Sequence, residues 1–159
     1  MCGFVGFTGH LVGGDEILKN MMDTIIHRGP DSAGTHIDSD VSLGFRRLSI
    51  IDLDSGTQPM YNETNDIVIV FNGEIYNYQE LKKDLIEKGH VFRNNSDTET
   101  LIHSYEEYGE AMLDRLRGMF AFVIWDGKKK KLFAARDFFG IKPFYYAIVD
   151  GQLVFASEI

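Results

Sequence analysis

One short run of residues constrains the fold more than any other: Ile67-Val68-Ile69-Val70-Phe71 is apolar throughout and rich in β-branched side chains. Strands that face water on one side alternate apolar and polar residues, whereas a continuous run is typical of a strand buried on both faces. The run therefore predicts a strand at 67–71 with packed layers on both sides. Because Asn72-Gly73-Glu74 follows directly, polar groups are expected at the end of this buried strand.

Helical signals occur in three further stretches. Between Asp15 and Ile26, apolar residues recur at helical spacing, which predicts one amphipathic helix. The segments 77–80 and 96–99 each resemble a capping box, with a polar residue followed three positions later by glutamate. These boxes predict two helices, which end near Gly89 and Gly109.

The remaining chain reads mainly as strands bounded by turn residues, with a short helix expected at 111–116. The expected strands are 2–7, 33–37, 41–50, 118–125, 131–136, 143–148 and 152–156. A loop is expected over the polar segment 52–59. Strands, then helices, then strands favour an α+β layered domain over alternating βαβ units. Buried strands flanked by helices indicate two stacked sheets with helices outside.

Composition excludes several classes of function. The 159 residues include 16 basic and 24 acidic residues, a net charge of −8, whereas nucleic-acid-binding domains usually show a basic face. No apolar stretch approaches the ~20 residues that span a bilayer, and no signal peptide is apparent. A single cysteine excludes an intrachain disulfide and favours a cytoplasmic location. We therefore expect one domain, with neither nucleic acid nor membrane as partner.

The histidines give no sign of a metal site. They stand at positions 10, 27, 36, 90 and 103, without an H-x-x-x-H pair or a cysteine partner. The sequence therefore predicts no metal ligand.

The single cysteine is Cys2, directly after the initiator Met1. Processing removes an initiator methionine when the next residue is small, and Cys2 would then carry both a thiol and a free α-amine. Their reference pKa values are about 8.5 and about 7.7–8.0. A base that titrates near neutral pH would thus lie in the same residue as a nucleophile. A cysteine in second position also arises by accident of the start site, so the residue alone decides nothing.

Three polar clusters lie where strands or helices are expected to meet loops, at 46–52, 71–77 and 94–99. Each has a purely structural interpretation. Arginines at a strand end are usually solvated, Asn-Gly after a strand is a common turn, and Ser-Asp-x-Glu is a common helix start. Taken singly, the structural interpretation is favoured in each case.

Together with Cys2, these clusters resemble the class II glutamine amidotransferase domain, the N-terminal-nucleophile (Ntn) type. More narrowly, they are similar to the glutaminase half of a glutamine-hydrolysing asparagine synthetase, the branch that the Arg47-Leu48-Ser49-Ile50 version of the arginine motif resembles. The matching segments run in order along essentially the whole chain: 1–3, 27–31, 47–52, 58–59, 72–77, 96–99, 118–122, 136–143 and 156–159. The resemblance implies a four-layer α-β-β-α sandwich of two stacked antiparallel sheets.

The resemblance also implies catalytic roles. Cys2 matches the nucleophile that attacks the glutamine carboxamide, and its α-amine matches the group that takes the thiol proton. The side-chain amide of Asn72 and the backbone N–H of Gly73 match the oxyanion hole. Because losing one oxyanion donor typically costs about 10²–10³ in kcat, Asn72 ranks just below Cys2 in expected effect. Arg28 and Asp31 match a family motif without a chemical step; they either shape the wall near the nucleophile or form an internal pair within a turn.

The implied substrate-binding residues are Arg47, Asn72, Gly73, Glu74 and Asp97. Free glutamine is a zwitterion with an amide tail, so its site needs a cation, an anion and oxyanion donors. Arg47 matches the residue that grips the α-carboxylate, which a guanidinium pairs bidentately. Glu74 and Asp97 match the carboxylates that hold the α-ammonium.

The resemblance thus predicts an enzyme that converts glutamine and water to glutamate and ammonia over a single domain, 1–159. No cofactor is expected in this domain. A synthetase domain using ATP and Mg²⁺ would receive the ammonia, on a longer chain or a separate one, and an exposed apolar patch is expected where it docks. The expected partners are L-glutamine and this synthetase, with a homodimer left open. Two alternatives remain: delivery of ammonia to a different acceptor, and a non-catalytic glutamine-binding module.

Overall fold

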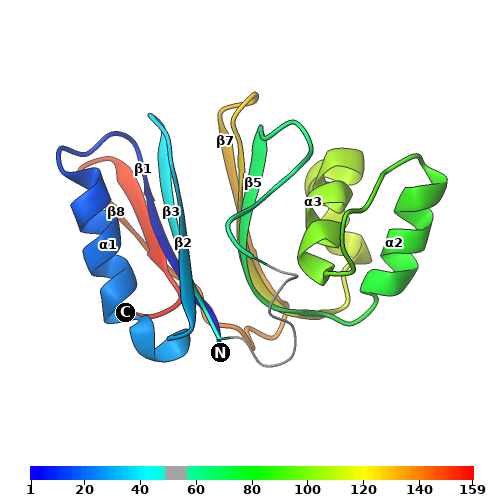
Figure 1. Ribbon diagram of the computed structural model, residues 1–159, viewed down its shortest axis with the longest axis horizontal. Helices are drawn as coiled ribbons and strands as arrows, with labels where there is room; N and C mark the ends of the chain where they lie inside the picture. Colours follow the sequence, from blue (N-terminus) through cyan, green and yellow to red (C-terminus); the bar gives the residue numbers. More distant parts are fainter. Residues whose placement is uncertain (49–56) are drawn as a thin grey trace.

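Two antiparallel sheets stacked face to face form the centre of the molecule (Figure 1). The computed structural model describes residues 1–48 and 57–159. The five-stranded sheet has the order β2-β3-β1-β9-β8, and the four-stranded sheet has the order β4-β5-β6-β7. The strands are β1 Gly3–Thr8, β2 Ser32–Ile37, β3 Val41–Arg47, β4 Met60–Tyr61, β5 Ile67–Ile75, β6 Gly118–Asp126, β7 Lys131–Arg136, β8 Tyr145–Val149 and β9 Gln152–Ala156.

Helices cover both outer faces of the stack. Helix α1 (Gly14–Thr24), followed by the 3₁₀ turn η1 (Ile26–Arg28), lies on the five-stranded sheet. Helices α2 (Tyr78–Glu87) and α3 (Asp97–Tyr108), with the 3₁₀ segment η2 (Gly109–Arg115), lie on the four-stranded sheet. The α-β-β-α sandwich is therefore confirmed, and so is the α+β class. Among the described residues, no helix is long and apolar enough to cross a bilayer.

Strand β5 explains why both faces must be covered. Val68 and Val70 face the other sheet and pack in the layer between the sheets. Ile67, Ile69 and Phe71 face the opposite way and pack under α3. Since side chains alternate along a strand, the continuous apolar run contributes side chains to two hydrophobic cores, one on each face of the sheet. The strand predicted at 67–71 is correct, and it continues through Asn72 and Gly73 to Ile75.

Most of the expected elements lie close to their predicted positions. The expected strand 41–50 is described as far as Arg47, and its last two residues lie outside the described part. Most of the loop expected at 52–59 lies outside it as well. The helix predicted from Asp15 to Ile26 ends at Thr24, and the strand expected at 143 begins at Tyr145. The short helix expected at 111–116 is the 3₁₀ segment η2.

The capping box predicted at 77–80 is wrong. The Asn77 side chain makes no cap hydrogen bond to α2. Its amide instead donates to the carbonyl of Arg115 at 2.9 Å, and its oxygen accepts from the backbone N–H of Arg117 at 2.9 Å. Asn77 thus ties the start of α2 to the segment before β6, a long-range contact that outweighs the local capping preference.

The box at 96–99 is half correct. The Ser96 hydroxyl accepts from the backbone N–H of Glu99 at 3.2 Å, as an N-cap should. The Glu99 carboxylate, however, accepts from the backbone N–H groups of Arg93 and Asn94, at 2.8 and 2.9 Å. Glu99 therefore fixes the loop that leads into α3.

Asp137 organises the turn after β7. Its carboxylate accepts from the backbone N–H groups of Phe120, Ile141 and Lys142 at 2.9–3.1 Å. Burial opposes its ionisation, yet the hydrogen bonds from Lys142, Ile141 and Phe120 outweigh this and lower the pKa of the Asp137 carboxyl below its usual value. The charged form of Asp137 therefore stabilises the folded state.

Replacing Asp137 tests this electrostatic contribution. Because a lowered folded-state pKa stabilises above the unfolded value of about 3.9, the Asp137→Asn protein should be less stable by about 1.5–3 kcal/mol at pH 7. The deficit should shrink as the pH falls below about 4, where the wild-type carboxyl is protonated too. Urea unfolding of the wild type and Asp137→Asn at pH 7, 4 and 3 measures the deficit in stability and its decrease at low pH. The exposed Asp114→Asn is the control; a deficit that does not change with pH would contradict the account.

Candidate functional site

Cys2 lies at the mouth of the layer between the sheets. It immediately precedes β1, and its half-buried side chain packs against the apolar core of that layer. Its Sγ is 3.9 Å from the carbonyl oxygen of Leu48, at the end of β3. Met1 is exposed and precedes Cys2 in the structure, so the nitrogen of Cys2 is here a peptide nitrogen.

The pairing of β1 with β3 brings Arg47 to the same place. Gly3 is opposite Arg46 in the antiparallel register, so the next position aligns Cys2 with Arg47. Phe45 faces the inter-sheet core, and Arg47 follows it by two residues on the same face. Arg46 faces the other way, where its Nε donates to the carbonyl of Met22 in α1 at 3.1 Å. Arg47 thus lies on the inter-sheet face of β3, and its neighbour Arg46 lies on the face that α1 covers.

Asn72 approaches from the other sheet. It continues the inward-facing set of Val68 and Val70 on β5. The residue is 3% exposed, and its Nδ2 has no hydrogen-bond partner within the described part of the chain. A buried donor without a partner costs roughly 1–3 kcal/mol, so such an amide is expected where a ligand completes its hydrogen bonds.

The backbone N–H of Gly73 lies along the free edge of β5. The N–H of Phe71 bonds to the Gln58 side chain at 2.6 Å, and the N–H of Ile75 bonds to Asp97 at 3.0 Å. Since backbone groups alternate along a strand, the Gly73 N–H points to this same edge, between those two. A Cβ at Gly73 would lie 2.2 Å from the carbonyl oxygen of Met119, so glycine permits the close approach of β5 to β6.

Glu74 and Asp97 form an acidic pair at this edge. Burial raises the pKa of the Asp97 carboxyl above its usual value, and the charge of Glu74 adds to the rise. The backbone N–H groups of Ile75 and Thr98 oppose the shift without cancelling it. Because the charge of Glu74 acts on Asp97, a cation bound near both carboxylates would be stabilised.

The contacts between the sheets bring these residues to one end of the stack. Gly34 of β2 pairs with Phe45, and a Cβ at Gly34 would lie 2.1 Å from the carbonyl oxygen of Gln58, whose side chain bonds Phe71. Phe45 and Phe71 therefore lie at a similar height in the stack. Arg47 lies two residues beyond Phe45, and Gly73 lies two residues beyond Phe71, so both are near the same end of the stack. In Figure 1 the N-terminus lies at this lower end, where β5 leaves the sheet toward α2. Residues 49–52 of the arginine motif lie outside the described residues.

The structure shows how Cys2 is held, and for Arg28 it supports the predicted place beside the nucleophile. The buried Arg28 donates through Nε to the carbonyl of Cys2 at 3.0 Å and through Nη1 to Glu158 at 2.6 Å. The bond from Arg28 lowers the pKa of the Glu158 carboxyl, with a smaller contribution from His27. Ser157 Oγ accepts from the N–H of Phe4 at 3.0 Å. The sequence identifies the segment 156–159 only as a motif. Its contacts with Arg28 and Phe4 form because β9 pairs with β1.

Comparison with known proteins identifies the family. The sequence profile of the glutamine amidotransferase domain matches residues 1–159. The chain belongs to this family. Among curated relatives, "Asparagine synthetase [glutamine-hydrolyzing] 1" of Bacillus subtilis is 50% identical over 163 residues, which cover 99% of this chain. "Asparagine synthetase [glutamine-hydrolyzing] 2" of rice (Oryza sativa subsp. japonica) is 50% identical over 84% of the chain, and an amidase of Gibberella zeae is 42% identical over all of it.

This amidotransferase domain spans about a quarter of those relatives: 26% of the Bacillus protein, 22% of the rice protein and 26% of the amidase. Solved structures confirm the fold. The glutamine phosphoribosylpyrophosphate amidotransferase of B. subtilis superposes with a TM-score of 0.80 at 22% identity, over 98% of this chain and 42% of that one. A structure described as the allosteric regulatory enzyme of purine biosynthesis gives 0.81 at 23% identity, with the same coverage.

Proposed function

We propose that this domain hydrolyses L-glutamine to glutamate and ammonia, with Cys2 as the nucleophile. The observation that carries the proposal is the convergence of Cys2, Arg47 and the unpartnered amide of Asn72 at one end of the inter-sheet layer. A thiol, a cation and a buried hydrogen-bond donor are the groups that an amide-cleaving site for an amino acid requires.

Recognition of glutamine follows from its charges. Arg47 pairs with the α-carboxylate, because the guanidinium fork matches two carboxylate oxygens. Glu74 and Asp97 bind the α-ammonium, whose positive charge stabilises the ionised Asp97 carboxylate against the burial, and the smaller repulsion from Glu74, that raise its pKa. With both ends of the amino acid held, the side-chain amide extends toward Cys2.

The chemistry requires removal of Met1, which frees the α-amine of Cys2. That amine takes the thiol proton, and the thiolate attacks the carboxamide carbon to give a tetrahedral intermediate. Asn72 Nδ2 and the Gly73 N–H donate to its oxyanion. The amine returns the proton to nitrogen, the C–N bond breaks, and ammonia leaves a thioester on Cys2. Water then hydrolyses the thioester, releasing glutamate and restoring the thiol.

The ammonia acceptor is proposed from the relatives. Most of the length of the asparagine synthetases lies beyond the part that matches this chain, so the acceptor is a synthetase domain or chain that uses ATP and Mg²⁺. An apolar groove of about 660 Å³ that includes the exposed Phe138, Phe139 and Ile141 fits the docking surface expected for it. The Gibberella amidase favours a second candidate, delivery of ammonia to a different acceptor. The unpartnered Asn72 amide beside Cys2 favours catalysis over a silent glutamine-binding module.

The remaining proposals concern the setting of the domain. With one cysteine and no intrachain disulfide, it functions in a reducing, cytoplasmic compartment. The hydrolysis above needs no cofactor, because the nucleophile, the base and the oxyanion donors are protein groups. Glutamine and the acceptor are its proposed partners.

The nucleophile is tested by comparing the wild type with Cys2→Ala. Intact mass analysis should show that Met1 is absent from active wild-type protein. Glutamate release from glutamine should fall to the assay background in Cys2→Ala, while circular dichroism and the melting temperature stay near wild type. Equal rates in the two proteins, or full activity with Met1 still attached, would contradict the mechanism.

The carboxylate assignment is tested by the two neighbouring arginines. Arg47→Ala should raise KM for glutamine at least tenfold, because a charge-assisted pair is worth about 1.5–3 kcal/mol. Arg46→Ala is the matched control: its side chain bonds α1 on the outer face of the sheet, so it should lower stability and leave KM within about twofold. An unchanged KM in Arg47→Ala, or the same KM increase in both, would overturn the assignment.

A further inference from the structure

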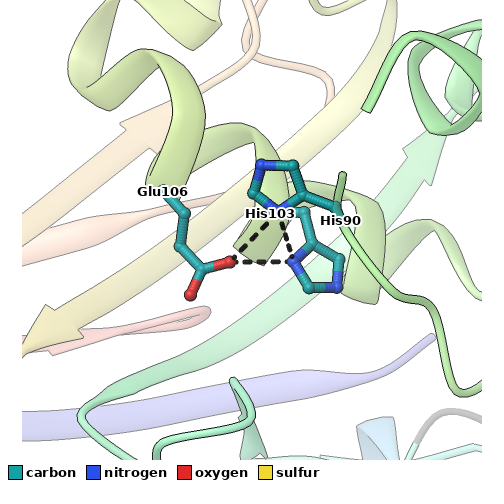
Figure 2. A group of neighbouring side chains, drawn as sticks. All are labelled: His90, His103 and Glu106. Atoms are coloured by element: carbon teal, nitrogen blue, oxygen red, sulfur yellow. Dashed lines mark hydrogen bonds and ion pairs between the residues drawn. The ribbon is translucent and has the colours of Figure 1, made fainter. Parts of the chain in front are cut away.

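Two histidines and a glutamate meet on the helical side of the four-stranded sheet. His103 and Glu106 lie one turn apart on α3, and His90 projects from the segment between α2 and α3 (Figure 2). The Nδ1 atoms of the two histidines and one oxygen of Glu106 point at a common centre. None of these residues takes part in the proposed glutamine chemistry.

The three atoms have the spacing of a metal site. His90 Nδ1 is 3.2 Å from His103 Nδ1, and Glu106 Oε2 is 2.8 Å from His103 Nδ1 and 3.6 Å from His90 Nδ1. Ligands about 2.0–2.1 Å from a tetrahedral zinc ion are separated by roughly 3.3 Å. The three distances bracket that value, so a cation fits between the ligands after shifts of a few tenths of an ångström.

A polar group lies behind each ligand. Glu106 Oε1 accepts from Asn62 Nδ2 at 2.8 Å. His90 Nε2 is 3.4 Å from Glu107 Oε2, and His103 Nε2 is 3.4 Å from Glu63 Oε1. Metal-bound histidines characteristically direct their second nitrogen at a carboxylate, which fixes the ring and increases its basicity. All three ligands therefore have an outer partner of the expected kind.

The groups around His103 favour a bound cation. The ring is 1% exposed, and its Nε2 has no hydrogen bond within the described part of the structure. Both ring nitrogens face carboxylate oxygens, those of Glu63 and Glu106. A neutral imidazole carries one N–H, so one of its nitrogens must present a lone pair to an oxygen. A metal ion at Nδ1 removes this conflict, because the N–H then sits on Nε2 and faces Glu63.

Glu106 supplies the third ligand atom, a carboxylate oxygen. Two neutral imidazoles and one carboxylate form a donor set suited to zinc.

We propose that His90, His103 and Glu106 bind one Zn²⁺ ion, with water as the fourth ligand. The ion ties the segment after α2 to α3 and, through Asn62, to the turn that precedes β5. This is a structural site: it holds the segment that carries His90 against the second half of α3. The proposal does not depend on the proposed glutaminase activity.

Zinc binding is measured best in a Cys2→Ala background, because a terminal thiol and amine would themselves bind zinc. The chelator-treated chain is titrated with Zn²⁺ in competition with a chromogenic chelator. We expect one ion per chain and a melting temperature about 5–10 °C higher at a hundredfold excess over Kd. X-ray absorption should show nitrogen and oxygen ligands at about 2.0–2.1 Å, with imidazole scattering and no sulfur.

Zn²⁺ binding by single-residue variants distinguishes this site from unspecific binding of the ion elsewhere on the protein. His90→Gln is preferred to a change at the buried His103, because His90 lies on a loop and its loss should leave the fold intact. It should weaken Zn²⁺ binding at least tenfold and abolish the rise in melting temperature, as should Glu106→Gln. His10→Gln, a histidine outside the cluster, is the control and should bind as the parent does. Equal binding by parent and His90→Gln, or no binding by the parent at micromolar zinc, would overturn the proposal.

Discussion

The packing of the two sheets against each other is the interaction on which the rest of the structure depends. Phe4 and Phe45 from one sheet meet Val70 and Ala121 from the other, all fully buried or nearly so. Each large apolar side chain removed from water contributes about 1.5–3 kcal/mol. Because each strand alternates its faces, this one layer also fixes where the strand ends project. Cys2, Arg47 and Asn72 continue the inward-facing rows past the last apolar residues, so the mouth of the layer is polar where its interior is apolar.

The polar mouth lowers the stability of the domain and prepares it for a polar ligand. The buried Asn72 amide has no partner in the described part of the chain, and Asp97 is held with its pKa raised. Both features disfavour the ligand-free protein, and in the proposed mechanism both are relieved by a zwitterion whose amide oxygen and ammonium reach them. Groups of this kind are retained where function requires them. In the sheet that carries Cys2, Arg28 donates a hydrogen bond to the carbonyl of Cys2, and Glu158 in turn accepts from Arg28. These bonds fix the position of the Cys2 backbone.

The sequence was sufficient for the architecture because the signals were local and strong. The apolar run at 67–71 required cover on both faces, and the candidate residues at the ends of strands followed from the resemblance to the amidotransferase family. What could not be predicted was set by contacts between distant segments. Asn77 has a good capping sequence but bonds to residues 115 and 117, and Glu158 reaches Arg28 only because β9 pairs with β1. His90 and His103 are too far apart in sequence to suggest a ligand pair until α3 packs beside the segment that carries His90.

In the proposed reaction, a liberated Cys2 attacks the side-chain carbonyl of a glutamine held by Arg47 of the same sheet and by Glu74 and Asp97 across the inter-sheet layer. The most direct measurement is covalent trapping with a glutamine analogue that carries an electrophilic diazoketone in place of the carboxamide, followed by intact mass and peptide mapping. The account predicts one adduct per chain, on Cys2 of protein that lacks Met1, with protection by excess L-glutamine and at least tenfold slower labelling in Arg47→Ala. Labelling elsewhere, or labelling of Cys2 that glutamine does not slow, would contradict it.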